Sequence, residues 1–134
     1  MLITREVDYA LRILRALSKG GQFTAVDLAE SEQIPQQFAY KILKKLKIGK
    51  LLTVQRGAMG GYTLTADLHH VSLYDLLNMM ENTKYVSSCM DENHQCAWRA
   101  KRDNAPCMVH IHLAGIQTSL DQHLKSYSLY ELIS

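Results

Sequence analysis

Long hydrophobic runs are absent from this sequence. No uninterrupted apolar stretch is longer than three residues, whereas a membrane-spanning helix needs about 20. Charged side chains at Arg5, Glu6 and Asp8 also break the apolar stretch that an N-terminal secretory signal would require. With 134 residues, 47% of them apolar and 21% charged, the chain is expected to be one folded domain in the cytoplasm, with no membrane as a partner.

Catalytic motifs are also missing, and cysteine is scarce. The sequence has no nucleotide-binding loop, no H-E-x-x-H zinc motif and no nucleophile paired with a base, so we expect that the protein is not an enzyme. Its three cysteines all lie within residues 89–107. An odd number cannot pair completely within one chain, and a reducing compartment would keep them as thiols. These cysteines therefore indicate metal binding or redox chemistry.

Negative charge is absent from one long segment. Residues 33–66 contain six Lys or Arg and no Asp or Glu, a local charge of +6, while the other residues carry nine basic and thirteen acidic side chains, or −4. A basic segment in a mildly acidic chain is typical of a nucleic-acid-binding surface, because contact with phosphates releases counterions. The alternative interpretation is a lysine-rich helix face that contacts only solvent.

Hydrophobic spacing predicts a mainly α-helical chain with one small β-hairpin. The expected helices run from Thr4 to Gly20, over 25–30, over 35–47 with Pro35 as the first helical residue, and over 72–81, and the expected strands are 51–55 and 61–65. In the third helix, Phe38, Ile42 and Leu46 form the expected buried stripe. Three helices followed by a hairpin is the order of a winged helix-turn-helix, whose recognition helix lies in the DNA major groove.

Residues 82–106 lack periodicity, and a long helix is predicted after Pro106. Its apolar positions recur at steps of four, three, four and four residues, close to the period of a seam between two helices: Val109, Leu113, Ile116, Leu120 and Leu124. Such a helix is expected to pair with a partner. The predicted organisation is a winged helix-turn-helix region over 1–81, a cysteine-containing sensor loop over 82–106, and a dimerisation helix and tail over 107–134, within one compact domain.

The helix over 35–47 carries the first candidate DNA contacts. The amides of Gln36 and Gln37 can donate to and accept from an adenine edge, and Lys41, Lys44 and Lys45 suit phosphate or guanine. Each of these residues also has a simpler interpretation as a solvent-exposed side chain.

The connection between the two strands carries further candidates. Arg56 suits a contact with the minor groove or a phosphate. Gly60 and Gly61 would let the backbone of the wing approach DNA closely, although a tight turn alone would also explain them.

The cysteines are spaced as Cys89-x6-Cys96-x10-Cys107, too wide for the paired knuckles of a structural zinc site. Three thiolates from one loop suit an iron–sulfur cluster, whose fourth ligand must be another residue type. His110 is one candidate, because it lies about one helical turn from Cys107, and the carboxylate of Asp8, from the same chain or across a dimer, is the other. Redox-active thiols without a metal are the alternative.

Taken together, these residues resemble the Rrf2 family of bacterial winged-helix iron–sulfur transcription regulators. The resemblance covers nearly the whole chain and rests on the opening Met1-Leu2-Ile3-Thr4, on Asp8-Tyr9-Ala10-Leu11-Arg12, on the helix from Ile34-Pro35 to Leu46, on Arg56-Gly57-x2-Gly60-Gly61-Tyr62-x-Leu64, and on the ending Tyr127-Ser128-Leu129-Tyr130-Glu131-Leu132. One departure is the interval between Cys96 and Cys107, which is longer than the family pattern.

The resemblance implies a homodimer, held by the long helix, that binds a partly palindromic promoter site on double-stranded DNA. It also implies roles by position: bases for Gln36, Gln37, Tyr40 and Lys41, minor groove and backbone for Arg56, Gly60 and Gly61, and an iron–sulfur cluster for Cys89, Cys96 and Cys107. The fourth ligand, His110 or Asp8, and the cluster type, 2Fe–2S or 4Fe–4S, both stay open.

The expected function is therefore a dimeric DNA-binding transcription regulator. Its affinity for a promoter would depend on an iron–sulfur cluster that senses redox state, nitric oxide or iron status. A regulator that responds through thiols or a small molecule without a cluster is the first alternative, and an electron-transfer or cluster-carrier protein is the second.

Overall fold

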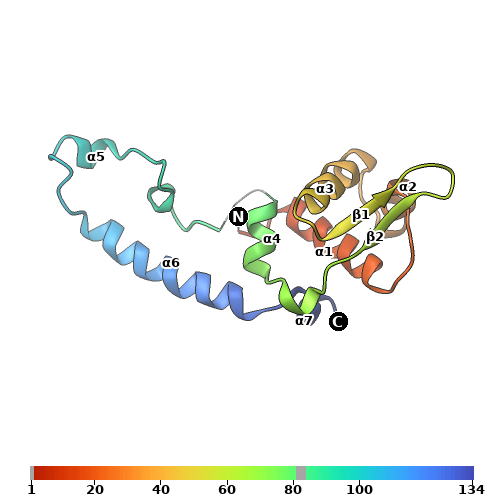
Figure 1. Cartoon of the computed structure of the whole chain (residues 1–134). Helices are drawn as coiled ribbons and strands as arrows, with labels where there is room; N and C mark the ends of the chain where they lie inside the picture. Colours follow the sequence, from red (N-terminus) through yellow and green to blue (C-terminus); the bar gives the residue numbers. More distant parts are fainter. Residues whose placement is uncertain (1, 81–83) are drawn as a thin grey trace.

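The computed structural model describes residues 2–80 and 84–134. In Figure 1 the N-terminal elements and the C-terminus form a body, from which α6 and the cysteine-containing segment extend as an arm. The elements in chain order are α1 (Arg5–Ser18), α2 (Ala25–Glu32), α3 (Gln36–Ile48), β1 (Leu52–Gln55), β2 (Gly61–Leu64), the 3-10 turn η1 (Leu68–His70), α4 (Leu73–Met79), the 3-10 turn η2 (Ser88–Met90), α5 (Ala97–Ala100), α6 (Met108–Ser126) and α7 (Leu129–Ile133).

Local side-chain caps fix where the first helices begin. The hydroxyl of Thr4 accepts a hydrogen bond from the backbone N–H of Val7 at the start of α1, and Thr24 and Asp27 form a reciprocal capping box at the start of α2. The third helix differs from the prediction by one residue, because Pro35 is the N-cap of α3 and the helical conformation begins after it.

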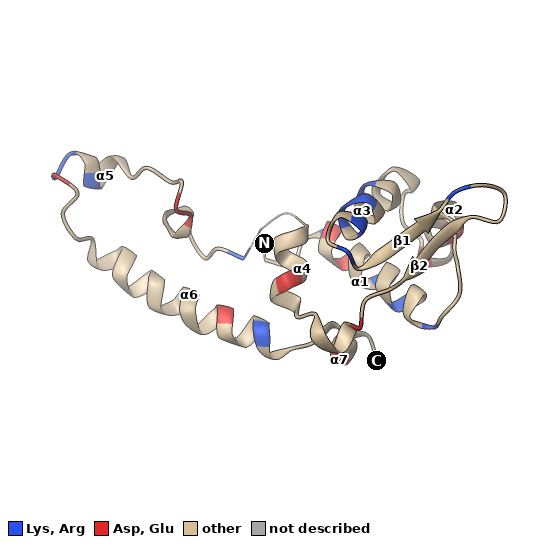
Figure 2. Cartoon of the chain, viewed as in Figure 1, with Lys and Arg blue, Asp and Glu red and all other residues tan. Residues whose placement is uncertain are grey.

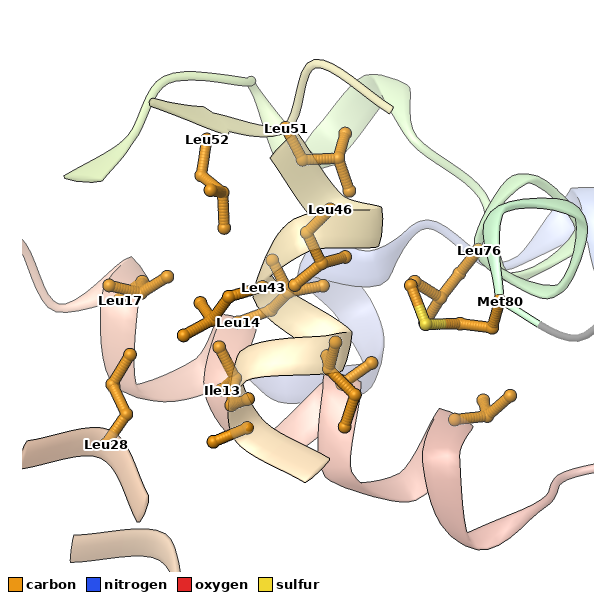
Figure 3. Close-up of a cluster of buried hydrophobic side chains, with 14 of the residues drawn as sticks. Ile13, Leu14, Leu17, Leu28, Leu43, Leu46, Leu51, Leu52, Leu76 and Met80 are labelled. Atoms are coloured by element: carbon orange, nitrogen blue, oxygen red, sulfur yellow. The ribbon is translucent and has the colours of Figure 1, made fainter. Parts of the chain in front are cut away.

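The core of the body lies where α1, α2, α3, β1 and α4 converge, as Figure 3 shows. On α3 the buried residues are Ala39, Ile42, Leu43 and Leu46, which follow the i, i+3, i+4, i+7 spacing of one helical face. Phe38, predicted to be in this stripe, is 38% exposed and packs edge-on against Tyr9 instead. The prediction was wrong for Phe38 and is confirmed for Ile42 and Leu46, which are fully buried.

The wing is an antiparallel hairpin in which Leu52 pairs with Leu64 and Gln55 with Gly61. A short bridge between Phe23 and Tyr62 adds the segment before α2 to this hairpin. The observed strands lie within the predicted ranges. The helices and the hairpin therefore confirm the predicted fold class, a mainly helical winged helix-turn-helix with a long C-terminal helix.

The long helix α6 is anchored to the body at its C-terminal end and at α4. Backbone N–H groups of Leu73 and Leu129 donate to the carbonyls of Tyr127 and Val71, at 3.0 and 2.7 Å. After this crossing α7 packs against α1 and η1 with Leu129 fully buried, so the C-terminal tail lies in the body. The predicted end of the α4 helix at Glu81 lies outside the described residues.

The predicted seam on α6 divides into two sets of residues. Leu124 is buried and Leu113 and Leu120 are half-buried against the chain itself. Val109 and Ile116, however, are 66% and 55% exposed. In the segments 2–80 and 84–134, no helix is long and apolar enough to span a membrane.

Candidate DNA interface and cysteine site

The outer face of α3 carries the amide-rich and basic residues that the sequence singled out. Gln36, Gln37, Tyr40, Lys41 and Lys44 are all exposed. Figure 2 shows that Lys and Arg residues gather on this helix and also occur at the wing. The helix thus presents long polar side chains to solvent, as a recognition helix must.

Two of the predicted DNA-contacting lysines are engaged within the body. The side chain of Glu6, on α1, is only 1% exposed, and its carboxylate forms ion pairs with Lys41, at 3.2 Å, and with Lys45. The ammonium group of Lys45 also donates to the backbone carbonyl of Met80 at 3.2 Å, and its side chain is 28% exposed. Lys45 therefore points into the body, while Lys41 is 54% exposed and can also reach outward.

Sequence reasoning missed Glu6 as a functional residue. The signal was present, because Glu6, Ala10, Ile13 and Leu17 follow the spacing of one buried helical face. A carboxylate on such a face needs a cationic partner, since burying an unpaired charge is very costly. The nearest cationic helix in the fold is α3.

At the wing, Arg56 is exposed, and the glycines have structural roles of their own. A Cβ atom at Gly60 would lie 2.1 Å from the carbonyl oxygen of Gln55, so only glycine fits there. Gly61, with φ of 157°, lies against the backbone of Phe23, where a Cβ atom would be 2.8 Å from the carbonyl oxygen. Both glycines are required to fold the wing, independently of any contact with DNA.

The three cysteines and His110 line one cavity of about 410 Å³ on the arm. All three thiols are half-buried. Cys107 is the N-cap of α6 and His110 lies in its first turn, while Cys89 is on η2 and Cys96 is the N-cap of α5. The arm thus gathers the donors that the sequence predicted, from three separate short elements.

Asp8 lies elsewhere in the same chain. It forms an ion pair with Arg12 at 2.8 Å and lines a separate cavity with Leu132 and Ile133. Within one chain, the structure therefore brings His110, and not Asp8, to the cysteines.

The donor set of this cavity fits an iron–sulfur cluster in kind, since thiolates and imidazole are the ligands that such clusters take. The spatial arrangement of these donors fits a cluster less well than their chemical type does. Among the described residues, no three His, Cys, Asp or Glu side chains are grouped closely enough to hold a metal ion. Holding a cluster therefore requires the cysteine segment to close further around the cavity.

An arginine organises the long interval between Cys96 and Cys107. Arg99, on α5, donates from Nε to the carbonyl of Ala105 at 3.1 Å and from Nη2 to the carbonyl of Asn104 at 2.9 Å. The return of this interval towards Cys107 is thus held by the Arg99 guanidinium group together with backbone hydrogen bonds from Asn104 and Ala105 to the carbonyls of Arg99 and Arg102.

A buried amide joins the cysteine segment to the long helix. Gln117 accepts a hydrogen bond from the backbone N–H of Val86 at 2.8 Å and donates to the carbonyl of Lys84 at 2.9 Å and to the carboxylate of Asp121 at 2.8 Å. Residues 84–86 are therefore fixed on α6 through their backbone.

Comparison with known proteins gives similar regulators over the full length of the chain. A family model for Rrf2, described as an iron-dependent transcriptional regulator, matches residues 3–134. An HTH-type transcriptional regulator of Aquifex aeolicus is 24% identical over 136 residues, which cover 100% of this chain and 92% of that protein. IscR of Vibrio parahaemolyticus, also an HTH-type transcriptional regulator, is 21% identical over 137 residues, covering 100% and 78%.

Solved structures share the fold. CymR, the global cysteine regulator of B. subtilis, has a TM-score of 0.70 and 20% identity, with 99% of this chain and 96% of that chain covered. IscR of T. potens has a TM-score of 0.65 and 14% identity, with coverages of 99% and 86%. These proteins are regulators and not enzymes, in agreement with the expectation from the sequence. Because the family model covers the chain from residue 3 to its last residue, the chain belongs to the Rrf2 family of transcriptional regulators.

Proposed function

We propose that this transcriptional regulator is a homodimer whose affinity for promoter DNA is set by an iron–sulfur cluster held on the arm. The observation that carries the proposal is the cavity lined by Cys89, Cys96, Cys107 and His110, on an arm that is attached to the body carrying the recognition helix. A change in the cysteine segment can therefore reach the DNA-binding body through α4 and α6.

The proposed DNA interface combines α3 with the wing. Gln36, Gln37 and Tyr40 would contact base edges in the major groove, and the exposed ammonium group of Lys44 would contact phosphate. Arg56, at the exposed connection of the hairpin, would contact the minor groove or a flanking phosphate. The lack of acidic residues over 33–66 supports this interface, since nothing in the segment repels DNA.

The proposed dimer contact is the exposed apolar side of α6. Met108, Val109 and Ile116 are all more than 45% exposed, and Val109 and Ile116 lie seven residues apart on one side of the helix. A row of exposed apolar side chains along one long helix is typical of a surface that a partner covers. A second copy would cover it in a two-helix seam, which would place two recognition helices on one DNA duplex.

In the proposed site, Cys89, Cys96 and Cys107 hold the cluster, and His110 or Asp8 supplies the fourth ligand. His110 is favoured by its place in the same cavity, whereas Asp8 would have to come from the partner subunit. An iron–sulfur cluster changes its charge on oxidation and is lost under oxidants or nitric oxide, which is the chemistry a sensor needs. Redox state, nitric oxide and iron status are the proposed signals.

A thiol-based regulator without a cluster is the second candidate. Two observations favour it: the absence of a group of three metal ligands among the described residues, and the structural similarity to CymR, whose description is that of a global cysteine regulator. Three half-buried thiols in one cavity could then respond directly to an oxidant or to a small molecule.

Anaerobic purification followed by absorbance, iron and sulfide analysis distinguishes the two candidates. A cluster predicts coloured protein with iron and sulfide in comparable amounts, and their loss in Cys89→Ala. The yield in His110→Ala and Asp8→Ala identifies the fourth ligand. A colourless, iron-free wild-type protein would refute the cluster and leave the thiol-based regulator.

Duplex binding is tested with fragments selected by the protein from a random-sequence library at low ionic strength. We expect the selected fragments to contain two related half-sites, as a symmetric dimer requires. Failure to bind any duplex in any state of the cysteines would refute the proposed function altogether.

A further inference from the structure

The buried carboxylate of Glu6 joins three elements of the body at one point. It lies on α1, it pairs with Lys41 and Lys45 on α3, and Lys45 also reaches the carbonyl of Met80 directly after the end of α4. Glu6 lies on α1 and Lys45 lies on the recognition helix α3, so their ion pair joins the recognition helix to α1. Met80 is the point at which the chain leaves the body for the cysteine segment.

Glu6 fixes the position of α3 because a buried carboxylate cannot lose its cations without a large desolvation cost. Lys45 serves both partners at once. Its ammonium group must stay within hydrogen-bond distance of both Glu6 and the Met80 carbonyl. If Met80 is displaced, Lys45 must either move with it or lose one of these two partners, and Lys45 is the side chain that holds α3 to α1.

The chain that follows Met80 continues to the segment that carries the cysteines. From residue 84 onwards the chain is held on α6 by Gln117, through the backbone of Lys84 and Val86, and Cys89 follows on η2. A movement of α6, or a change in the conformation of the cysteine segment, is therefore expected to displace the end of α4.

We propose that Glu6 and Lys45 are positioning residues which, through the carbonyl of Met80, make the pose of the recognition helix depend on the cysteine segment. The inference rests on the proposed function and names its route of regulation. It also assigns Lys45 an internal role in place of a contact with DNA. Lys44, the exposed neighbour of Lys45, keeps the role of phosphate contact.

The two adjacent lysines give a matched pair of variants. Lys45→Met removes the charge but keeps the length of the side chain, and it leaves Glu6 paired with Lys41. Lys44→Met makes the same change one position away on the exposed face. Circular dichroism melting of both proteins establishes that they fold.

The salt dependence of DNA binding is the first measurement. Each phosphate contact contributes about 0.9 to the slope of log K against log salt concentration. Lys44→Met should reduce that slope by about 0.9 per subunit, whereas Lys45→Met should leave it unchanged. A reduction of the same size in Lys45→Met would overturn the inference, since Lys45 would then be an ordinary phosphate contact.

The second measurement is the change in affinity when the cysteines are modified. We compare anaerobically purified protein with the same protein after alkylation of its three cysteines by N-ethylmaleimide, on a duplex selected by the wild type. The wild type should change its affinity tenfold or more. Lys44→Met should keep that ratio at lower affinity in both states, and Lys45→Met should reduce the ratio below threefold.

The failures of the two proposals are distinguishable. Wild-type protein that binds no duplex refutes the proposed function. If the affinity of the wild type for DNA is the same before and after alkylation, both the control of DNA binding by the cysteines and the route through Met80 and Lys45 are refuted. An undiminished ratio in Lys45→Met, beside a responsive wild type, refutes the route alone. If Lys45→Met does not fold, Lys45→Gln, which keeps a donor for Glu6 or Met80, is judged by the same ratio.

Discussion

Replacing Ile116 with Glu on the exposed side of α6 should dissociate the proposed homodimer without unfolding the subunit. The side chain is 55% exposed, so covering its remaining surface accounts for about half of the roughly 1.5–3 kcal/mol of a fully buried Ile. An isologous interface contains this residue twice, which gives about 1.5–3 kcal/mol, or roughly a 10- to 150-fold weaker dimer. Two carboxylates brought into one seam weaken it further.

Sedimentation equilibrium of Ile116→Glu and wild type measures this change in the dimer dissociation constant. The matched control is Thr118→Glu, which adds the same charge at an exposed position about 160° away around the helix. It should leave the dissociation constant within about threefold and melt with the same midpoint. A dimer constant unchanged in Ile116→Glu would refute α6 as the seam, since an exposed charge on a free helix face has little effect.

Three further substitutions test the wing, the cysteine segment and a surface carboxylate. Gly60→Ala should distort the wing, because its Cβ would lie 2.1 Å from the Gln55 carbonyl oxygen, and so should lower the melting temperature and weaken duplex binding by tenfold or more; unchanged affinity would show that the wing does not contact DNA. Arg99→Met should speed hydrogen exchange at the amides of Asn104 and Ala105 by at least tenfold, because the turn that their backbone hydrogen bonds close loses the two bonds from the Arg99 side chain; unaltered exchange would exclude this role. Hydrogen bonds from the backbone and the ring of His69 lower the pKa of Asp67, so its contribution to stability is complete above the ordinary carboxyl pKa and falls as the pH drops below it; Asp67→Asn should show a smaller loss of melting temperature over that acid range than wild type.

Local signals made the architecture predictable. Thr4 and Thr24 cap their helices by hydrogen bonds to residues three positions away, so the sequence alone contains both partners. Phe38 was wrongly assigned to the buried stripe of α3 because it is as apolar as its neighbours, and only packing against Tyr9 on another helix decides which of them faces the core.

The sequence singled out Cys89, Cys96 and Cys107, with His110 or Asp8 as the fourth ligand, and one cavity is lined by the three cysteines and His110. The contacts that hold the site are non-local: Gln117 bonds to backbone more than 30 residues away, and Glu6 pairs with a lysine 39 residues away. Periodicity carries no information about such pairs.

The attachment of α6 at two points determines how the arm can act on the body. A single flexible connection would let the arm move while the recognition helix stayed in place. Here the C-terminal end of α6 is bonded through Tyr127 to the start of α4, and Gln117 holds the backbone of Lys84 and Val86.

The helix α4 is thus shared between arm and body, since Leu76 and Leu77 are fully buried in the core of the body. A rotation of α6, or a change in the cysteine segment that pulls on residues 84–86, must therefore displace α4. Packed cores shift between discrete arrangements and do not deform continuously. The Met80 carbonyl at the end of α4 meets the recognition helix through Lys45, so this displacement reaches the surface that faces DNA.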